Sequence, residues 1–276
     1  KVWLGIDNGN VCLFDAGIKQ VVKTFRNPYS ADTPRNLTKD NKDPNIIWFS
    51  TLFDGIFKLN TEKGKFIQYN NTPGDKNSLS SDSVLSLLQT GDNLWIGTYG
   101  GGLNKFNKKT CSFTQYKHSF KDKNSIGGDI VIYVYIDTRG AFWVSTGDGG
   151  LNRFNEQTER FVSYGTSSGF PSNTIEHILE DDNGYLWIST NAGIVKFDTQ
   201  NLKVVKVLTK EDGLPDNDFD IYTNALKDSS GNLWFSTMHG VCEFNPKIAS
   251  SIKQNLNIPP VVLSSFKSKE GTYNNR

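Results

Sequence analysis

Cysteine and histidine are both scarce in this 276-residue sequence, which contains three of each. The three cysteines lie far apart, and the sequence has no CxxC motif, no HExxH motif and no close Cys/His spacing. Zinc sites need closely spaced ligands, and an odd number of scattered cysteines does not form a disulfide framework. We therefore expect three unpaired thiols, no metal site and no cofactor.

An excess of one charge and long hydrophobic runs are also missing. The 30 basic and 29 acidic residues leave a formal net charge of +1, which gives no electrostatic reason to expect nucleic acid as a partner. No apolar run approaches the roughly 20 residues that a membrane span needs. The opening residues 1–3 read as strand rather than as a signal peptide, and we expect them to be a cut end that does not indicate the compartment.

The sequence does contain an internal repeat marked by tryptophan. The clearest copies are 94–107 (LWIGTYGGGLNKFN) and 142–155 (FWVSTGDGGLNRFN). Successive tryptophans are 44 to 48 residues apart, a period typical of propellers and related repeat folds. All six tryptophans of the chain lie in this motif: Trp3, Trp48, Trp95, Trp143, Trp187 and Trp234.

Each repeat predicts four short strands joined by turns. A β-rich run such as 131–136 ends in a polar turn such as 137–140, and the tryptophan strand follows. After a glycine-rich turn come a third strand, which ends in Phe-Asn or Phe-Asp, and a fourth strand such as 113–116. Four strands in about 45 residues match one propeller blade. The sequence therefore predicts an all-β fold, a β-propeller of four-stranded antiparallel blades over residues 1–247, with about six repeats visible.

The repeats at the two ends are shorter than the others. Only two residues precede Trp3, so the first repeat lacks an inner strand, and the last repeat has three strands before Pro246. We expect four full and two partial blades, with sequence missing on the N-terminal side. Cys12 and Cys242 occupy the same column of different blades. Blades stack about 10 Å apart and bridged Cα atoms lie within about 7 Å, so we expect no disulfide between them.

Two columns of the repeat have a packing interpretation. The residue two positions after each tryptophan is small, and we expect a bulky group such as an indole to occupy the space beside it. These residues are Gly5, Ser50, Gly97, Ser145, Ser189 and Ser236. Most third strands end in an aromatic residue, which we expect in the core rather than on a base-stacking platform. These aromatic residues are Phe14, Phe106, Phe154, Phe197 and Phe244.

Several motifs that suggest chemistry have a better structural explanation. The turn 181–184 (DDNG) lacks the twelve-residue calcium loop, and the same aspartate column recurs at Asp137 and Asp228, so a hairpin turn is favoured. Gly100–Gly102 has no Lys-Ser/Thr pair after it and recurs in the repeat, which favours a tight strand connection over a phosphate loop. His177 lies in a strand-like run and is expected to pack. We assign no catalytic residue.

The repeat resembles the two-component regulator propeller family. The resemblance rests on the motif LWIGTxGGLNxF[ND] and on the intervening segments 213–217 (GLPDN), 77–79 (NSL) and 124–126 (NSI), and it covers residues 1–247. It implies a propeller that usually has seven blades, so this chain would be part of a larger ring. The segment 258–266 (IPPVVLSSF) resembles the opening strand of the three-tyrosine β-sandwich, so residues 248–276 are expected to be a linker and that first strand.

The resemblance implies a sensor. Members of the family are extracytoplasmic, periplasmic modules of membrane-anchored receptors whose output is usually a cytoplasmic histidine kinase. It further implies the rest of the receptor chain as a partner, a homodimer in the full-length receptor, and a carbohydrate or other small polar ligand. Two alternatives stay open: a non-catalytic protein-interaction scaffold, and a propeller lyase or glycosidase. A downstream transmembrane segment and kinase in the gene would favour the sensor.

The candidate ligand site follows from topology. In an antiparallel meander successive turns alternate between two faces, so the turns between second and third strands share a face with the connections between blades. Those turns vary from blade to blade, and variation at a fixed scaffold position suits a binding surface. The candidate ligand-binding residues are Asp54, Tyr99, Asp148, Asn191 and His239.

Overall fold

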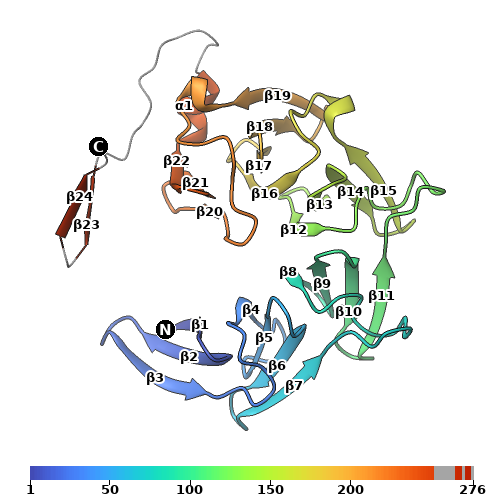
Figure 1. Cartoon of the computed structure of the whole chain (residues 1–276), viewed down its shortest axis with the longest axis vertical. Helices are drawn as coiled ribbons and strands as arrows, with labels where there is room; N and C mark the ends of the chain where they lie inside the picture. Colours follow the sequence, from blue (N-terminus) through green and yellow to red (C-terminus); the bar gives the residue numbers. More distant parts are fainter. Residues whose placement is uncertain (252–264, 269–270, 275–276) are drawn as a thin grey trace. The chain divides into compact units, whose positions relative to one another are not determined.

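The computed structural model describes residues 1–251, 265–268 and 271–274. Almost all of the regular structure in these residues is β-strand in antiparallel sheets, which confirms the all-β prediction (Figure 1). The chain divides into two compact units. The N-terminal unit comprises Lys1–Gly165 and Asn173–Ile175, and the C-terminal unit comprises Thr166–Ser172 and Glu176–Arg276.

The N-terminal unit contains four sheets, which we call blades 1 to 4. Blade 1 has three strands: β1 (Val2–Ile6), β2 (Asn10–Asp15) and β3 (Gln20–Phe25). Blade 2 has four: β4 (Arg35–Lys39), β5 (Ile46–Ser50), β6 (Ile56–Asn60) and β7 (Lys65–Tyr69). Blade 3 has β8 (Val84–Thr90), β9 (Asn93–Thr98), β10 (Gly102–Asn107) and β11 (Ser112–Tyr116). Blade 4 has β12 (Val131–Ile136), β13 (Phe142–Thr146), β14 (Leu151–Asn155) and β15 (Arg160–Tyr164).

The C-terminal unit contains blades 5 and 6, apart from Ile175 at the start of β16. Blade 5 has β16 (Ile175–Glu180), β17 (Tyr185–Thr190), β18 (Gly193–Asp198) and β19 (Lys203–Leu208). Blade 6 has β20 (Leu226–Lys227), β21 (Leu233–Thr237) and β22 (Gly240–Phe244). A short helix, α1 (Pro246–Ser251), follows, and then a hairpin of β23 (Ser265–Ser268) and β24 (Gly271–Asn274). Most of the strand expected at 258–266 lies outside the described residues.

Every blade is a sequential meander, in which each strand pairs antiparallel with the next along the chain. Within the N-terminal unit the first strands β4, β8 and β12 lie on the inner side, and the fourth strands β7, β11 and β15 lie on the outer side (Figure 1). This is the β-propeller arrangement that the repeat predicts. No helix in the described part of the chain is long and apolar enough to cross a membrane.

The core lies between neighbouring blades, where tryptophans meet the aromatic column. In the N-terminal unit the ring of Trp48 lies 5.8 Å from that of Phe106, and the ring of Trp95 lies 5.3 Å from that of Phe154. In the C-terminal unit Trp187 and Phe244 are 5.0 Å apart. In each pair the phenylalanine belongs to the blade after the tryptophan. The predicted core role is confirmed for Phe106, Phe154 and Phe197, which are buried, while Phe14 and Phe244 are only partly buried. Such aromatic pairs stabilise the interfaces between blades.

The aspartate turns hold the tryptophan strands. The indole N–H of Trp143 donates to Asp137 Oδ2 at 2.9 Å, while Asp137 Oδ1 accepts from the backbone N–H groups of Arg139 and Ala141. Asp181 and Asp228 bind Trp187 and Trp234 in the same way at 2.9 and 3.0 Å. One carboxylate thus accepts hydrogen bonds both from the backbone of its own turn and from the indole N–H, which supports the structural interpretation of these turns.

At Gly5 and Gly97, the two glycines of the small column, no indole fills the neighbouring space, so the expectation is wrong at these two positions. A Cβ atom on Gly97 would lie 2.3 Å from Ser86 Oγ and 2.7 Å from Val131 Cγ1. At Gly5 it would lie 2.1 Å from the carbonyl oxygen of Pro34. The space is taken by the inner strands of the same and the next blade, and by the connection between blades 1 and 2. The tryptophans instead pack against the aromatic column.

Candidate functional site: the turn face

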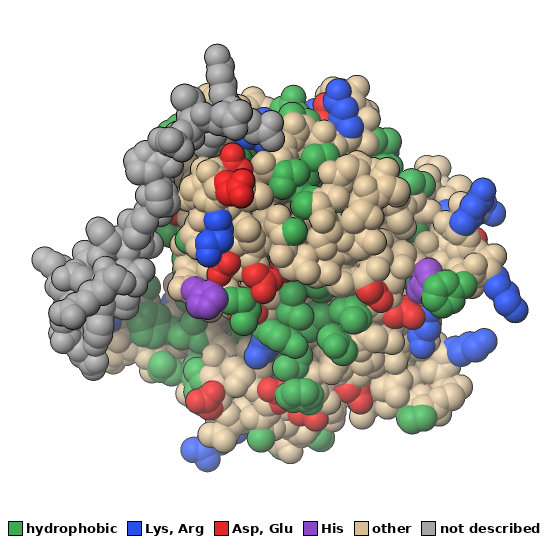
Figure 2. Space-filling view, turned by 45° about the horizontal axis from the view of Figure 1, so that its top comes forward, with side chains coloured by type: hydrophobic (Ala, Val, Ile, Leu, Met, Phe, Trp, Pro, Cys, Tyr) green, Lys and Arg blue, Asp and Glu red, His purple; other side chains and the backbone are tan. Residues whose placement is uncertain are grey.

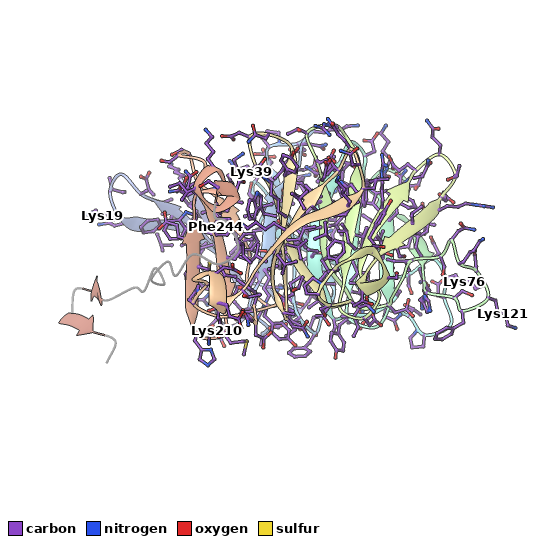
Figure 3. The ribbon with its side chains drawn as sticks, turned by 90° about the horizontal axis from the view of Figure 1, so that it is seen from above. Lys19, Lys39, Lys76, Lys121, Lys210 and Phe244 are labelled. Atoms are coloured by element: carbon purple, nitrogen blue, oxygen red, sulfur yellow. The ribbon has the colours of Figure 1, made fainter. Side chains whose placement is uncertain are left out.

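The turn face comprises the turns between the tryptophan strand and the strand after it, together with the connections between blades. The alternation of turns is visible within the N-terminal unit. In the N-terminal unit Lys39, at the end of β4, lies toward one face, while Lys76 and Lys121, in the connections after blades 2 and 3, lie toward the other (Figure 3). In the C-terminal unit Lys210, in the connection between blades 5 and 6, lies at the lower edge of the view (Figure 3).

Asp54 lies in the β5–β6 turn and contacts the connection between blades 1 and 2. Its Oδ2 accepts from Ser30 Oγ at 2.6 Å, and Asp32 Oδ2 in turn accepts from the backbone N–H groups of Leu52 and Phe53 at 2.6 and 3.0 Å. The turn and the connection therefore hold each other through reciprocal charge-assisted hydrogen bonds. Asp54 is a positioned carboxylate that is only partly accessible.

Tyr99 lies in the β9–β10 turn, and its ring is half exposed. Its backbone N–H donates to Ser83 O at 2.8 Å and its carbonyl accepts from Ser81 Oγ at 3.1 Å, so the connection between blades 2 and 3 fixes its backbone. Its hydroxyl makes no hydrogen bond within the part of the chain that the structure describes. Tyr99 therefore presents both an aromatic face and a free hydroxyl to solvent.

Asp148 lies in the β13–β14 turn, against the connection between blades 3 and 4. A Cβ atom at Gly128 would lie 1.9 Å from Asp148 Oδ1, and one at Gly127 would lie 2.3 Å from the carbonyl oxygen of Gly149. Only glycine allows this connection to approach so closely. The turn is also joined to it by the hydrogen bond from Gly147 N to Ile130 O, 2.9 Å long. Asp148 itself is exposed.

Asn191 and His239 are the candidate residues of the C-terminal unit. Asn191 is exposed at the β17–β18 turn. His239, in the β21–β22 turn, has a side chain that is 83% exposed, and its Nδ1 lies 2.6 Å from Asp216 Oδ2. The hydrogen bond with His239 lowers the pKa of Asp216. Asp216 lies in the connection between blades 5 and 6, so this turn is also joined to the connection before its blade.

The turn face therefore carries its candidate residues as two groups, each fixed within its own unit. Asp54, Tyr99 and Asp148 lie on three consecutive blades of the N-terminal unit, and Asn191 and His239 lie on the two blades of the C-terminal unit. Large apolar side chains are exposed beside them, and hydrophobic side chains show on the molecular surface among acidic and basic ones (Figure 2). Phe53 is 67% exposed and Met238 is 60% exposed.

The sequence reasoning missed the residues of the connections that hold these turns. Ser30 and Asp32 have no repeat motif that would mark them. Asp216 belongs to the segment GLPDN, which supports the family resemblance. Its place in the connection just before blade 6 could have predicted a contact with the β21–β22 turn of that blade. Asn77 and Ser78 of the NSL segment also have a structural role. Ser78 Oγ closes its loop by accepting from the backbone N–H of Thr72 at 3.0 Å.

A buried ionisable pair lies at the start of β16. Glu176 is 1% exposed, and burial raises its pKa to about 8, with Asp218 and Asp220 adding to the rise. His177, beside it in the chain, is buried as predicted, and burial lowers its pKa to about 4. Near neutral pH both side chains are therefore mainly uncharged, as expected for groups held in the protein interior.

A polar network lies on the opposite face of the N-terminal unit. Lys108 Nζ donates to Asp40 Oδ2, Asn41 Oδ1 and Gln89 Oε1, each at 2.8 Å, and Trp48 donates its indole N–H to Asp40 Oδ2. Burial raises the pKa of Asp40, but the hydrogen bond from Lys108 and three further hydrogen bonds outweigh it and lower the pKa to about 2. These groups satisfy one another, so we interpret them as structural.

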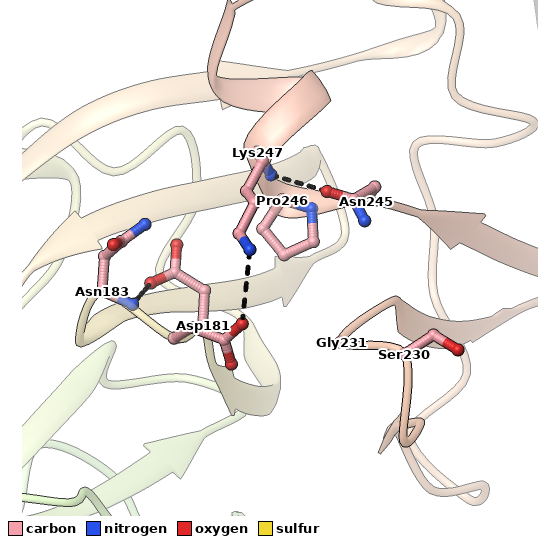
Figure 4. Close-up of a pocket in the computed structure, with 8 residues that line it drawn as sticks. Asp181, Asn183, Ser230, Gly231, Asn245, Pro246 and Lys247 are labelled. Carbon is pink, nitrogen blue, oxygen red and sulfur yellow. Dashed lines mark hydrogen bonds and ion pairs between the residues drawn. The ribbon is translucent and has the colours of Figure 1, made fainter.

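A small polar pocket lies on that face of the C-terminal unit (Figure 4). Asp182 forms ion pairs with Lys227 at 2.7 Å and with Lys247 at 3.9 Å, and the cavity volume is about 10 Å³. That volume has room for about one water molecule. The pocket is therefore too small for an organic ligand. No group of three or more potential metal ligands occurs among the described residues.

Residues 78–100 and 169–192 match the family described as "Two component regulator propeller". These two segments carry the two-component regulator propeller repeat. Both matched segments run from a connection between blades through a tryptophan strand and into the following turn. The match does not reach residues 248–276, so a three-tyrosine domain there stays an expectation. None of the curated proteins matches the chain.

Solved structures share the propeller fold with this chain. Two are extracellular domains of proteins assigned as hybrid two component systems of B. thetaiotaomicron. One is 22% identical with a TM-score of 0.64, covering 78% of this chain and 29% of the other. The second is 23% identical with a TM-score of 0.63, covering 88% and 33%. A third, PorZ of Porphyromonas gingivalis, a bacterial surface component of the type-IX secretion system, is 14% identical with a TM-score of 0.65, covering 88% and 37%. This chain therefore spans about a third of their length.

Proposed function

We propose that the chain is part of the extracytoplasmic sensor propeller of a two-component signalling receptor, and that it is not catalytic. The turn face binds a small polar ligand, such as a carbohydrate, and the receptor signals to a cytoplasmic histidine kinase. The regulator propeller repeats and the likeness to extracellular propellers of two-component systems support this assignment. The proposal also includes the other parts of the receptor chain as partners and a homodimeric receptor.

The observation that carries the proposal is the linkage of variable turns to the connections between blades. Asp54 accepts a hydrogen bond from Ser30, and His239 is hydrogen-bonded to Asp216; both distances are 2.6 Å. A ligand that hydrogen-bonds to a turn competes for these carboxylates and so changes how the connection is held. Because each connection leads into the first strand of a blade, binding at the turn face biases the position of that blade. A sensor needs such differential contacts between its states.

The chemistry of the turns suits a sugar. Tyr99 offers a half-exposed ring on which a sugar ring can stack, and its hydroxyl is available as donor and acceptor. Asp148 and Asn191 supply an exposed carboxylate and an exposed amide, on the N-terminal and the C-terminal unit respectively. Several polar groups beside aromatic surface are typical of small-ligand sites.

The test is a set of alanine substitutions in the intact receptor. A thermal-shift screen against saccharide fragments first identifies a ligand that raises the melting temperature. Asp54, Tyr99, Asp148, Asn191 and His239 are then changed to alanine one at a time, and the signalling response to that ligand is measured. Gln157→Ala, at an exposed tip on the opposite face, is the matched control. If all five variants stay folded and respond like the control, the turn face is not the sensor site.

A protein-docking role is the second candidate, because the turn face exposes large apolar side chains. Phe53, in the β5–β6 turn, and Met238, in the β21–β22 turn, are both exposed. Exposed apolar side chains rimmed by polar groups are typical of protein contacts. If Phe53→Ala and Met238→Ala abolish the response while the five alanine variants do not, the face docks a protein segment and does not bind a sugar.

A further inference from the structure

A groove lies at the outer rim of blade 3, away from the candidate residues of the turn face. Its cavity volume is about 630 Å³, within the range of small-ligand sites. One wall is the outer strand β11, with Phe113, Thr114 and Gln115, and the other is the connection 70–80. The groove lies wholly within the N-terminal unit.

Hydrogen bonds hold both walls of the groove in place. Asn77 Oδ1 accepts from the backbone N–H of Phe113 at 2.9 Å, and Gln115 Nε2 donates to Ser78 O at 2.8 Å, so the connection is fixed to the strand edge. Ser78 Oγ also closes the loop on Thr72. Because the walls are preformed, a ligand would meet little cost of ordering the protein.

Two lysines and one aspartate line the groove, so its lining carries more positive than negative charge. Lys76 and Lys117 line it, and neither forms an ion pair with any residue that the structure describes. The single lining carboxylate, Asp75, already accepts from the backbone N–H of Asn77 through Oδ1 at 2.8 Å. Two free ammonium groups at a polar groove favour an anionic ligand.

The neutral lining groups specify the rest of the ligand. The hydroxyls of Thr72 and Thr114 make no side-chain hydrogen bonds within the described ranges, and the Oε1 atom of Gln115 accepts none there. Phe113 is only partly buried and adds apolar ring surface to the wall. Hydroxyls, an amide and a ring beside two cations match a sugar ring that carries a carboxylate.

We propose that this rim groove binds an anionic saccharide, with Lys76 and Lys117 holding its carboxylates and Phe113 lying against a sugar ring. None of the five candidate residues of the turn face lines this groove, and the proposal does not depend on ligand binding at them. It adds a second recognition surface to the same propeller, one with a preference for acidic sugars.

The experiment is a calorimetric titration of the whole chain with trigalacturonate. The carboxyl-reduced, neutral trisaccharide is the matched ligand, and we expect trigalacturonate to bind at least about tenfold more tightly, because charge-assisted hydrogen bonds are the stronger ones. Lys76→Ala with Lys117→Ala should remove that difference. Lys123→Ala is the control variant, because it occupies the equivalent place in the connection after blade 3 and does not line the groove. It should bind like the unchanged chain.

Three results would overturn the assignment. Equal affinity for the acidic and the neutral trisaccharide would exclude recognition of the carboxylates. An equal loss of affinity in the Lys123 variant would show that only diffuse charge is involved. Adenosine monophosphate binding as tightly as trigalacturonate, with the same dependence on Lys76 and Lys117, would show an anion site that does not select sugars. Turn-face variants such as Tyr99→Ala should leave all of these titrations unchanged, so the two sites fail or succeed separately.

Discussion

At the scale of single residues, the strongest constraints come from polar groups that are buried with a partner. Asp137 is nearly inaccessible, and it accepts hydrogen bonds from the indole of Trp143 and from two backbone N–H groups of its own turn. Its repeated position was recognisable in the sequence as a turn residue. The bond to the tryptophan six residues later was not, because it depends on how the hairpin folds back.

We expect Asp137→Ala to reduce the free energy of unfolding by about 2 to 3 kcal/mol, because it leaves the buried indole N–H and turn N–H groups without their acceptor. Urea denaturation followed by tryptophan fluorescence measures this loss. The control is Asp15→Ala, which removes a partly exposed turn carboxylate that accepts from Gly17 N and lies 3.9 Å from Lys1 Nζ. It should change stability by less than about 0.5 kcal/mol. A similar small effect at Asp137 would contradict the structural role of this column.

A second residue-scale prediction concerns pH and Glu176. The pKa of Glu176 is raised from 4.5 to about 8, so the folded state keeps a proton that the unfolded state releases. Stability therefore falls as pH rises from 4.5 to about 8 and levels off above it. His177, with a pKa lowered from 6.5 to about 4, acts below pH 6.5, where stability falls as pH falls. The window from 6.5 to 8 thus isolates Glu176.

Glu176→Gln should remove the decline in stability between pH 6.5 and 8, a change of about 2 kcal/mol at one pKa unit per 1.36 kcal/mol. The measurement is the urea unfolding free energy at pH 6.5, 7.2 and 8. Glu211→Gln, an exposed carboxylate of the same unit, controls for the loss of one negative charge. If the variant and the control decline equally, Glu176 is not the group responsible.

At the scale of secondary structure elements, the strands could be predicted from the sequence, but the contacts between elements of different blades could not. The alternation of β-rich runs with glycine-containing turns predicted the meander, because each strand pairs with its neighbour in the chain. The space beside Gly97 is filled by Val131 of the next blade, which a single repeat cannot reveal. The same holds for the contact of His239 with Asp216, because the residues are distant in sequence and adjacent only after the connection crosses the turn.

The contact between connections and turns gives the element-scale prediction. Gly127→Ala places a Cβ atom 2.3 Å from the carbonyl oxygen of Gly149, and backbone cannot move aside as a flexible side chain can. We expect a loss of about 1 to 3 kcal/mol in the free energy of unfolding. Gly17→Ala is the control, since its nearest neighbour is a side-chain oxygen of Asp15 at 3.3 Å. Equal stability of the two variants would show that the connection is not pressed against the turn.

At the scale of the whole molecule, the two compact units place the three cysteines in different surroundings. Cys12 is buried in blade 1 of the N-terminal unit and Cys242 is buried in blade 6 of the C-terminal unit, while Cys111 is exposed. All three are free thiols in the structure. Burial raises the pKa of Cys242 to about 12, so the reactive thiolate form of that residue is rare at ordinary pH.

Thiol labelling under native conditions should therefore show one fast and two slow reactions. Cys111 reacts first because it is exposed, whereas Cys12 and Cys242 are buried and react only when local unfolding exposes them. Cys111→Ala should remove the fast phase and leave the two slow ones unchanged. In denaturant all three thiols should react, and the intact mass should match the fully reduced chain. A mass lower by two hydrogens, with Cys111 as the only titratable thiol, would show that Cys12 and Cys242 are bridged and would contradict their assignment to separate blades.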